Sequence, residues 1–231
     1  MPRKTQVSLT TFNSEGRLLQ VEYAKKAAML SNTIISLRLE EGLLIGLKND
    51  YKNKGEIRFF GTRLFLINKK IGLGGAGFFQ DIKMIVKKAR NHSKAYKQNY
   101  GEEISVRQLV RDLAGFIQEF TQTGGVRPFA AFVSILGFEN EGPLLYQIDP
   151  SGVFLKSRAD SIGRKACQVK RFLQRRKIEN LTIKEAFNLI FLAFRKNFEG
   201  DEDKSSYQFS LVDKFSAFKI LGVENMKKYF Q

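Results

Sequence analysis

A glycine-rich segment carries the spacing of a dinucleotide-binding loop. The residues Gly72-Leu73-Gly74-Gly75-Ala76-Gly77 match the pattern G-x-G-x-x-G, in which backbone amides at a helix N-terminus would hold a pyrophosphate. No Asp or Glu stands about 20 residues further on to hold a ribose, and no Gly-Lys-Ser or Gly-Lys-Thr follows as in a P-loop. The preceding strands also look like a hairpin rather than half of a βαβ unit. The segment therefore predicts a close crossing of a helix over a sheet, and no cofactor is expected.

Nucleophilic or metal chemistry would have to rely on very few side chains. His92 is the only histidine and Cys167 is the only cysteine, so a Ser-His-Asp site, a Cys-His site or a thiolate metal centre lacks partners. His92 falls in a basic, polar part of a predicted helix, and we expect its side chain to be exposed. The carboxylates of Glu102-Glu103 and Asp201-Glu202-Asp203 fall at predicted turns, where we expect them to be solvated. No catalytic or metal site is predicted.

The elements that would position these side chains follow from the spacing of apolar residues. Strands are predicted at 33–39, 43–47, 64–67, 71–73, 129–138, 144–148, 153–157, 207–212 and 217–221. Helices are predicted at 82–96, 105–120, 165–176, 182–194 and 223–230. Ser105-Val106-Arg107-Gln108 and Thr182-Ile183-Lys184-Glu185 fit capping boxes, which predict where two of these helices begin.

The order of these elements predicts the fold class. Helices come in pairs between groups of strands rather than singly, so a doubly wound parallel sheet is disfavoured. We predict an α/β (α+β) fold, a four-layer αββα sandwich of two mostly antiparallel sheets with helix pairs on the outside. No segment looks like a linker, so residues 1–231 are predicted to form a single domain.

Composition limits the classes of function. The single cysteine suits a reducing compartment, and because no apolar run reaches about 18 residues, no membrane partner is expected. Lys and Arg outnumber Asp and Glu by 39 to 23, a net charge of +16, concentrated at Lys83–Lys97 and Lys165–Lys177. Such charge is typical of a nucleic-acid-binding module or of a solvated surface with acidic neighbours in an assembly. Stacking aromatics are not interleaved with it, which favours the assembly and no nucleic acid.

An amphipathic helix is predicted ahead of the first strand, from about Arg17 to Leu30 within residues 14–30. Ser14 is predicted to cap it, Glu15 to lie in its first turn, and Glu22 to lie within ion-pairing reach of the next two lysines. One apolar stripe is formed by Leu18, Val21, Ala24 and Ala28. This stripe must be buried either on the chain's own domain or against a neighbouring subunit.

The segment from Phe12 to Ala24 resembles the N-terminal signature of proteasome alpha subunits, roughly Phe-Ser-Pro-Glu-Gly-Arg-Leu-x-Gln-Val-Glu-Tyr-Ala, with Asn13 and Ser14 in place of Ser-Pro. Two further segments resemble recurrent segments of that family, Gly124-Gly125-Val126-Arg127-Pro128-Phe129 and Asp149-Pro150-Ser151-Gly152. Three more look most like its alpha type-2 branch: Ser8-Leu9-Thr10-Thr11-Phe12, Gln118-Glu119-Phe120-Thr121-Gln122 and Phe198-Glu199-Gly200. The resemblance covers nearly the whole chain and implies the N-terminal-nucleophile hydrolase-like fold.

The resemblance implies a structural and gating subunit of the outer alpha ring of the proteasome core particle, which controls entry of substrates for degradation. Residues 1–11 would be the tail that helps to close the axial pore. The family's Tyr-Asp-Arg tail motif is replaced by Thr5-Gln6-Val7, so the contact it makes is missing here. The implied gate and ring contacts are Thr10, Thr11, Phe12, Glu15, Gly16, Arg17, Gln20, Glu22 and Tyr23.

The resemblance also implies a pocket between adjacent alpha subunits, where a lysine receives the C-terminal carboxylate of an activator tail. Arg63 aligns with that lysine, and Gly77 and Phe78 would line the same pocket. An arginine keeps the positive charge and can pair with a carboxylate in bidentate form. The alternative is a surface arginine at a strand edge.

The implied partners are other proteasome alpha and beta subunits and an activator or regulatory particle, in the cytoplasm and nucleus. In the related beta subunits, catalysis uses an N-terminal threonine released by cleavage after glycine, with its own amine as base. Thr10 and Thr11 follow no glycine, and cleavage at the only Gly-Thr pair, Gly61-Thr62, would remove the front helix and two strands. We therefore predict a non-catalytic subunit, with a hydrolase using Thr10 or Thr11 as an alternative.

Overall fold

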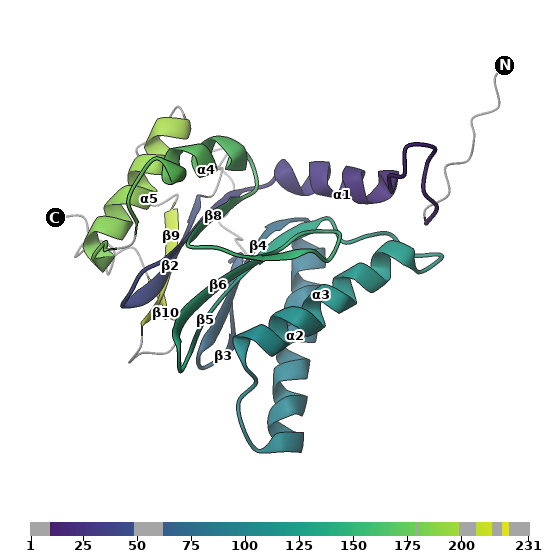
Figure 1. The fold of residues 1–231 in the computed structure, drawn as a ribbon, viewed down its shortest axis with the longest axis horizontal. Coiled ribbons are helices and arrows are strands. Elements are labelled where there is room, and N and C mark those ends of the chain that lie inside the picture. Colours follow the sequence, from purple (N-terminus) through teal and green to yellow (C-terminus); the bar gives the residue numbers. More distant parts are fainter. Residues whose placement is uncertain (1–9, 49–61, 179, 199–206, 214–218, 222–231) are drawn as a thin grey trace, which may run out of the picture.

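The computed structural model describes residues 10–48, 62–178, 180–198, 207–213 and 219–221 (Figure 1). Its helices are α1 (Leu19–Met29), α2 (Phe79–Tyr100), α3 (Val106–Gln122), α4 (Ala166–Gln174) and α5 (Ile183–Asn197). Its strands are β1 (Thr33–Arg38), β2 (Gly42–Lys48), β3 (Leu64–Asn68), β4 (Ile71–Gly77), β5 (Ala131–Glu139), β6 (Gly142–Ile148), β7 (Phe154–Lys156), β8 (Ala159–Ile162), β9 (Tyr207–Asp213) and β10 (Lys219–Leu221).

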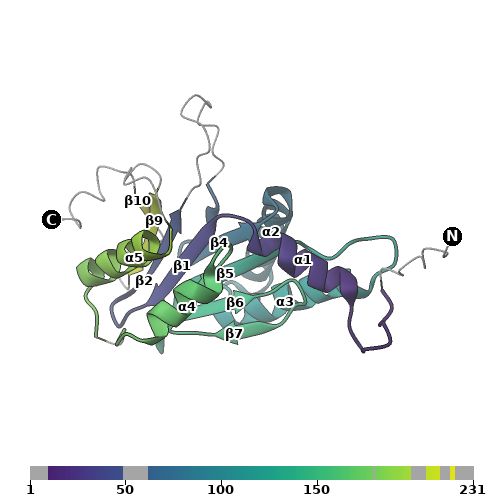
Figure 2. The same cartoon turned by 90° about the horizontal axis from the view of Figure 1, so that it is seen from above.

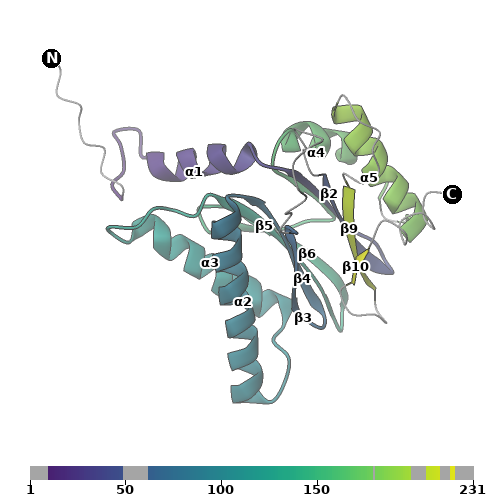
Figure 3. The same cartoon turned by 180° about the vertical axis from the view of Figure 1, so that it is seen from behind.

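The strands form two sheets packed face to face. One has the order β10-β9-β2-β1-β8 and the other β3-β4-β5-β6-β7, and every pairing in the described residues is antiparallel. Figures 1 and 3 show α4 and α5 over the first sheet and α2 and α3 over the second. The predicted four-layer αββα sandwich is confirmed.

Apolar side chains fill the three spaces between these four layers. The space between the sheets holds Ile34, Ile45 and Leu64, each fully buried. Under α4 and α5 the core is rich in aromatic rings, with Phe187 and Phe209 centred 4.9 Å apart. Each sheet buries one face against the other sheet and its opposite face against a pair of helices. The two sheets and their helices therefore depend on one another for stability.

The glycine-rich segment is strand β4 itself, not a loop before a helix. A Cβ added at Gly74 would lie 2.4 Å from Ile45 Cδ1 of the opposite sheet, and one at Gly75 would lie 2.4 Å from Ile82 Cγ2 of α2. Since such distances are too short for any side chain, these glycines permit close packing on both faces of the strand. The predicted close crossing of a helix over a sheet is confirmed.

Helix α1 lies outside both helical layers. Figures 1 and 2 show it extending beyond the sheets on the side of the N-terminus, and its body packs against β4 and β5. The predicted cap is wrong, because α1 begins at Leu19 after Leu18, which makes no side-chain capping bond. Glu15 therefore lies before the helix, and Glu22 is the acidic residue in its first turn.

The other helix starts were predicted with mixed success. Thr182 and Glu185 form the complete capping box of α5. Ser105 accepts a hydrogen bond from the Gln108 backbone, but the Gln108 side chain turns to Asp112, so that box is only half formed. Strand β8 was not predicted. The predicted helix 223–230 and the carboxylates at 201–203 lie outside the described residues.

His92 differs from the expectation of an exposed side chain, whereas Glu102 and Glu103 are exposed as predicted, Glu103 with an ion-pair partner. His92 is half-buried, and its Nε2 lies 2.7 Å from Asp112 Oδ2 on α3. Glu103 pairs with Lys97 at 2.5 Å. The His92 contact joins α2 to α3, which lies beside it. The Lys97 contact joins α2 to the turn that directly follows α2. Within the described ranges, no helix is long and apolar enough to cross a membrane.

Candidate functional site

A tight turn precedes α1 and fixes the residues that the sequence predicted as ring contacts. Asn13 Oδ1 accepts hydrogen bonds from the backbone N of Glu15 at 3.0 Å and of Arg17 at 2.8 Å. The backbone of Asn13 also bonds to both Gly16 and Arg17. Gly16 has a φ of +73°, which favours glycine. The turn is therefore closed by its own hydrogen bonds, while its side chains remain exposed.

Charges alternate along this turn and the start of α1. Arg17 Nε lies 3.6 Å from Glu15 Oε2 and 3.7 Å from Glu22 Oε1. All three side chains are more than a third exposed, so these pairs add little to stability and stay available to a neighbouring molecule. Lys25, one of the two lysines predicted to pair with Glu22, instead reaches Asp149 Oδ2 at 2.6 Å.

The two sides of α1 meet different surroundings. Val21, Ala24 and Ala28 are buried against the chain's own sheet, so the stripe packs on its own domain. The other side leaves Tyr23 51% and Leu30 77% exposed. These exposed apolar groups are the part of the helix that its own domain leaves uncovered, and such groups mark contact surfaces when they gather.

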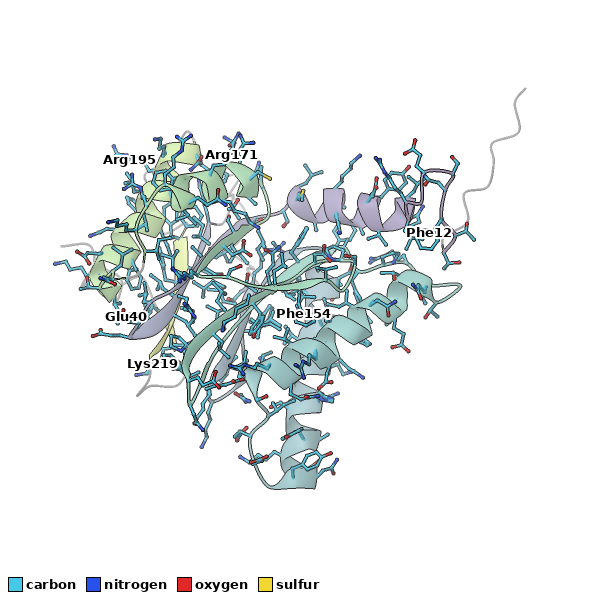
Figure 4. All side chains as sticks on the ribbon, viewed as in Figure 1. Phe12, Glu40, Phe154, Arg171, Arg195 and Lys219 are labelled. Atoms are coloured by element: carbon cyan, nitrogen blue, oxygen red, sulfur yellow. The ribbon has the colours of Figure 1, made fainter. Side chains whose placement is uncertain are left out.

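The remaining predicted gate residues surround the same turn. Phe12 is 66% exposed and lies at the outer end of the molecule (Figure 4). Thr10 and Gln20 are half-buried, and Thr11 is exposed. The structure therefore brings the predicted gate and ring residues together at one end, around the start of α1.

The turn after β6 anchors α1 to the body. Asp149 Oδ1 accepts hydrogen bonds from Ser151 N, Ser151 Oγ and Val153 N at 2.8, 2.5 and 3.2 Å, while Oδ2 accepts from Lys25. A Cβ on Gly152 would lie 2.7 Å from the Ala114 carbonyl of α3. This segment was identified in the sequence only by resemblance, and its role as the meeting point of α1, α3 and β6 was missed.

Arg63, Gly77 and Phe78, predicted to share a pocket, lie close together. Arg63 Nη1 donates to the Gly77 carbonyl at 2.8 Å, and Arg63 Cζ lies 5.7 Å from the ring centroid of Phe79. Burial lowers the pKa of the Arg63 guanidinium from its ordinary value. Gly77 has a φ of +135°, and a Cβ there would lie 2.1 Å from the Ala130 carbonyl, so only glycine fits.

A second arginine, Arg127, lies beside Phe78 and was not predicted from the sequence. Arg127 forms two hydrogen bonds of 2.7 Å to buried Asp81, and its Cζ lies 5.7 Å from the Phe78 ring. The bond to Asp81 raises the pKa of Arg127. Phe78 is 53% exposed and lies beside Arg127, whereas Arg63 lies beside Phe79. The arrangement can bind an anion beside an apolar ring.

The candidates for nucleophilic chemistry are not brought together in the described residues. Thr62 Oγ1 exchanges hydrogen bonds of 3.1 Å with the backbone of Leu64. His92 lies on α2 with Asp112, and Cys167 lies exposed on α4. The described part of the chain holds no group of three or more potential metal ligands.

Comparison with known proteins yields consistent matches. A family model for proteasome subunits matches residues 29–210, and a second model, for the N-terminal signature of A-type proteasome subunits, matches residues 8–27. The chain is similar to proteasome subunit alpha type-2 of Dictyostelium discoideum, with 35% identity over 96% of this chain and 95% of that protein. It is 34% identical to the Drosophila melanogaster protein of the same name, over 96% and 94% of the two chains. The corresponding Trypanosoma brucei brucei protein is 31% identical over 98% and 97%.

Proposed function

Because this chain belongs to the proteasome alpha subunit family, we propose that it is a non-catalytic subunit of the outer alpha ring that helps to gate substrate entry. Residues 1–231 would act as one alpha-type domain, with residues 1–11 as the gate tail. The observation that carries the proposal is the end of the molecule where the signature turn, charged residues and exposed apolar residues of α1 lie together.

The ring contact would be made by the uncovered side of α1. Tyr23 and Leu30 are exposed on a helix whose opposite stripe is already packed, which supports burial against an adjacent subunit. Glu15, Arg17 and Glu22 would exchange their weak mutual pairs for contacts across that interface. Other alpha and beta subunits are the proposed partners.

The activator site would be the pocket at Arg63. The Gly77 carbonyl orients the guanidinium through one N–H, and an arginine has five N–H donors, so others remain for a terminal carboxylate. Phe78, which directly follows Gly77, offers an exposed ring for an apolar side chain of the activator tail. A lysine at this position would supply a point charge without the bidentate geometry.

Lack of peptidase activity is part of the proposal. Thr62 has its hydroxyl engaged by the Leu64 backbone, which supports a structural role for the Gly-Thr pair. An intact N-terminus, with no adduct after treatment with a threonine-directed inhibitor, is the expected result. The proposed location is the cytoplasm and nucleus, supported by the exposed free thiol of Cys167, which suits a reducing compartment.

Native mass spectrometry of the endogenous, affinity-tagged chain tests the assembly role. We expect the chain to elute in a large particle together with other alpha and beta subunits, and crosslinks from α1 to reach an adjacent alpha subunit. Elution as a monomer, or bound to nucleic acid, would overturn the proposed ring function while leaving the family assignment intact.

A further inference from the structure

The outer face of α4 and α5 carries a group of cationic side chains that the proposed contacts at α1 and at Arg63 do not use. Arg171, Arg175 and Arg176 come from α4 and the residues just after it, and Lys196 comes from the last turn of α5. They line a hollow of about 430 Å³ between the two helices, here named the basic hollow. Figure 4 shows Arg171 and Arg195 directed outward from this face.

The four cations of the basic hollow form no ion pair within the part of the chain that the structure describes. The other residues that line the hollow are Gln168, Phe172 and Asn197. No carboxylate from the described residues faces the hollow. Because like charges four residues apart on a helix repel, Arg171 and Arg175 destabilise the unbound surface, and an anion placed between them would remove the repulsion.

An apolar hollow of about 410 Å³ adjoins the basic one. Its apolar lining comes from Leu181, Leu189 and Leu192, of which Leu192 is 43% exposed, and its polar lining comes from Arg176, Lys177, Glu185 and Asn188. Arg176 lines both hollows, so they meet at this side chain. Glu185, the one carboxylate among the described residues lining the apolar hollow, is already held in the capping box of α5. Sites for carboxylates and for an apolar side chain therefore lie next to each other.

We propose that the α4–α5 face binds an extended acidic segment of another protein. Its carboxylates would occupy the basic hollow, where guanidinium groups pair with carboxylates in bidentate form, and a large apolar side chain would enter the apolar hollow. Two adjoining hollows of different character fit a chain with two kinds of side chain better than they fit a small anion.

The aromatic ring in the basic hollow argues against nucleic acid. Phe172 is only 9% exposed, and its ring is covered by Arg176 Cζ at 4.4 Å and Lys196 Nζ at 5.5 Å from the centroid. Single-stranded nucleic acid is held largely by bases stacked on free aromatic faces. The Phe172 ring has no free face on which a base could stack. Carboxylates, which need no stacking partner, therefore fit the cations of the basic hollow better.

Fluorescence anisotropy on the full-length chain tests the proposal with a labelled peptide of Asp and Glu residues around a central Leu. The Arg171→Ser/Arg175→Ser variant should bind at least about tenfold more weakly. The matched control Lys87→Ser/Lys94→Ser removes the same charge from exposed positions on α2, and its affinity should stay within about twofold of the unmodified chain. Equal losses in both variants would overturn the proposal, because they would show general charge attraction.

The apolar hollow is tested separately. Leu192→Ser should weaken binding of the Leu-containing peptide by about fivefold and leave binding of a peptide with Ser in place of Leu unchanged. No selective loss would overturn the two-hollow arrangement. Unchanged melting temperatures of all variants would show that the fold is intact, since each change lies on exposed side chains.

Two alternative occupants are distinguished by further measurements. If an oligouridylate of the same charge binds more tightly than the peptide and loses affinity in the Arg171→Ser/Arg175→Ser variant, the occupant is nucleic acid and the proposal fails. An acidic run of this chain follows α5 in the sequence, outside the described residues: Glu199, Asp201, Glu202 and Asp203. Neutralising this run should leave peptide affinity unchanged, whereas a gain of about tenfold would overturn the proposal by showing that the chain competes for its own hollow.

Discussion

Each helical layer meets its sheet at a buried aspartate that pairs with a cation, and the two carboxylates differ in how many hydrogen bonds they accept. Asp81 on α2 accepts two bonds from Arg127 and a third from the Ala130 backbone at 2.8 Å. Asp160 on β8 pairs through Oδ1 with Lys170 at 2.6 Å, but its Oδ2 has no hydrogen-bond partner within the described residues. The Asp81 pair holds the layer of α2 and α3 to its sheet, whereas the Asp160 pair leaves part of its desolvation cost uncompensated.

The same contrast appears at the surface. Near α2 and α3, Lys97 pairs with Glu103, and Arg107 pairs with Glu139 and Glu141. On α4 and α5, the basic hollow gathers cations without such partners in the described residues. The net charge of +16 is therefore not a uniform property of the molecule. The layer of α2 and α3 pairs part of its positive charge within the chain. The layer of α4 and α5 keeps the cations of the basic hollow available to another molecule.

The largest expected effect comes from removing the satisfied carboxylate. Asp81→Ala should lower the free energy of unfolding by about 3 kcal/mol, because it leaves the Ala130 N–H and the Arg127 guanidinium without their acceptor. Urea denaturation measures the change, and Asp81→Asn, which keeps one oxygen acceptor, should lose less. A loss no larger than that of Asp160→Ala would remove the distinction between the two carboxylates.

A smaller effect is expected where each helical layer meets its sheet at a glycine. A Cβ at Gly75 would lie 2.4 Å from Ile82 of α2, and a Cβ at Gly46 would lie 2.7 Å from Ile190 of α5. Gly75→Ala should cost about 2 kcal/mol in unfolding free energy, and Gly46→Ala somewhat less. Gly115→Ala on α3, where a Cβ meets nothing within 4 Å, is the control and should stabilise by up to about 1 kcal/mol. If Gly115→Ala also lowered the unfolding free energy, the losses at Gly75 and Gly46 could not be attributed to contact between the helices and the sheets.

The unsatisfied carboxylate should respond to pH. Burial raises the pKa of Asp160 despite the nearby Lys170, so the folded state binds more protons than the unfolded state between the two pKa values. The stability contributed by this carboxyl therefore falls as pH rises through that window, and the penalty is complete above the folded pKa.

Asp160→Asn should accordingly stabilise the protein by about 1 kcal/mol at neutral pH and by less at about pH 4. The Lys170 side chain is 38% exposed and can turn to water when its partner is lost. Denaturant unfolding at the two pH values measures this difference. If Asp160→Asn stabilised the protein equally at both pH values, the pKa of Asp160 would not differ between the folded and unfolded states.

The smallest effect concerns the cations of the basic hollow. Arg171→Gln/Arg175→Gln should raise the unfolding free energy by about 0.3 kcal/mol at low salt, because it relieves repulsion between neighbouring turns. The gain should vanish at about 1 M salt. Thermal unfolding at two salt concentrations provides the comparison, and a gain that persists at high salt would rule out repulsion as its cause.

Most elements could be predicted from the spacing of apolar residues, and the exceptions have local causes. Strand β8 was missed because Asp160 and Ser161 are buried polar residues, which give no alternating apolar signal. Strand β4 was predicted only to Leu73, since the glycines that follow are uncommon in strands. At the turn before α1, Asn13 rather than Ser14 supplies the acceptor, and both residue types can do so, so the sequence alone could not choose.

The site residues that were predicted are those that align with motifs of the family. The residues that were not predicted are distant in the sequence and come together only in the folded chain. Arg63 directly precedes β3 and Gly77 is the last residue of β4, the strand paired with β3, and their proximity followed from aligning β4. Asp81 and Arg127 are 46 residues apart, and neither position shows a local pattern that pairs it with the other. The grouping of cations in the basic hollow likewise needs the packing of α4 on α5.

The attachment of α1 to Asp149 has a bearing on the order in which the subunit matures. A helix of eleven residues has little stability alone, so α1 depends on packing against β4 and β5 and on the ion pair from Lys25 to the turn after β6. A chain whose second sheet is incomplete would therefore lack an ordered front helix. If neighbouring subunits bind this helix, as proposed above, they would not bind a chain whose second sheet is incomplete. Only fully folded copies would then be incorporated into the ring.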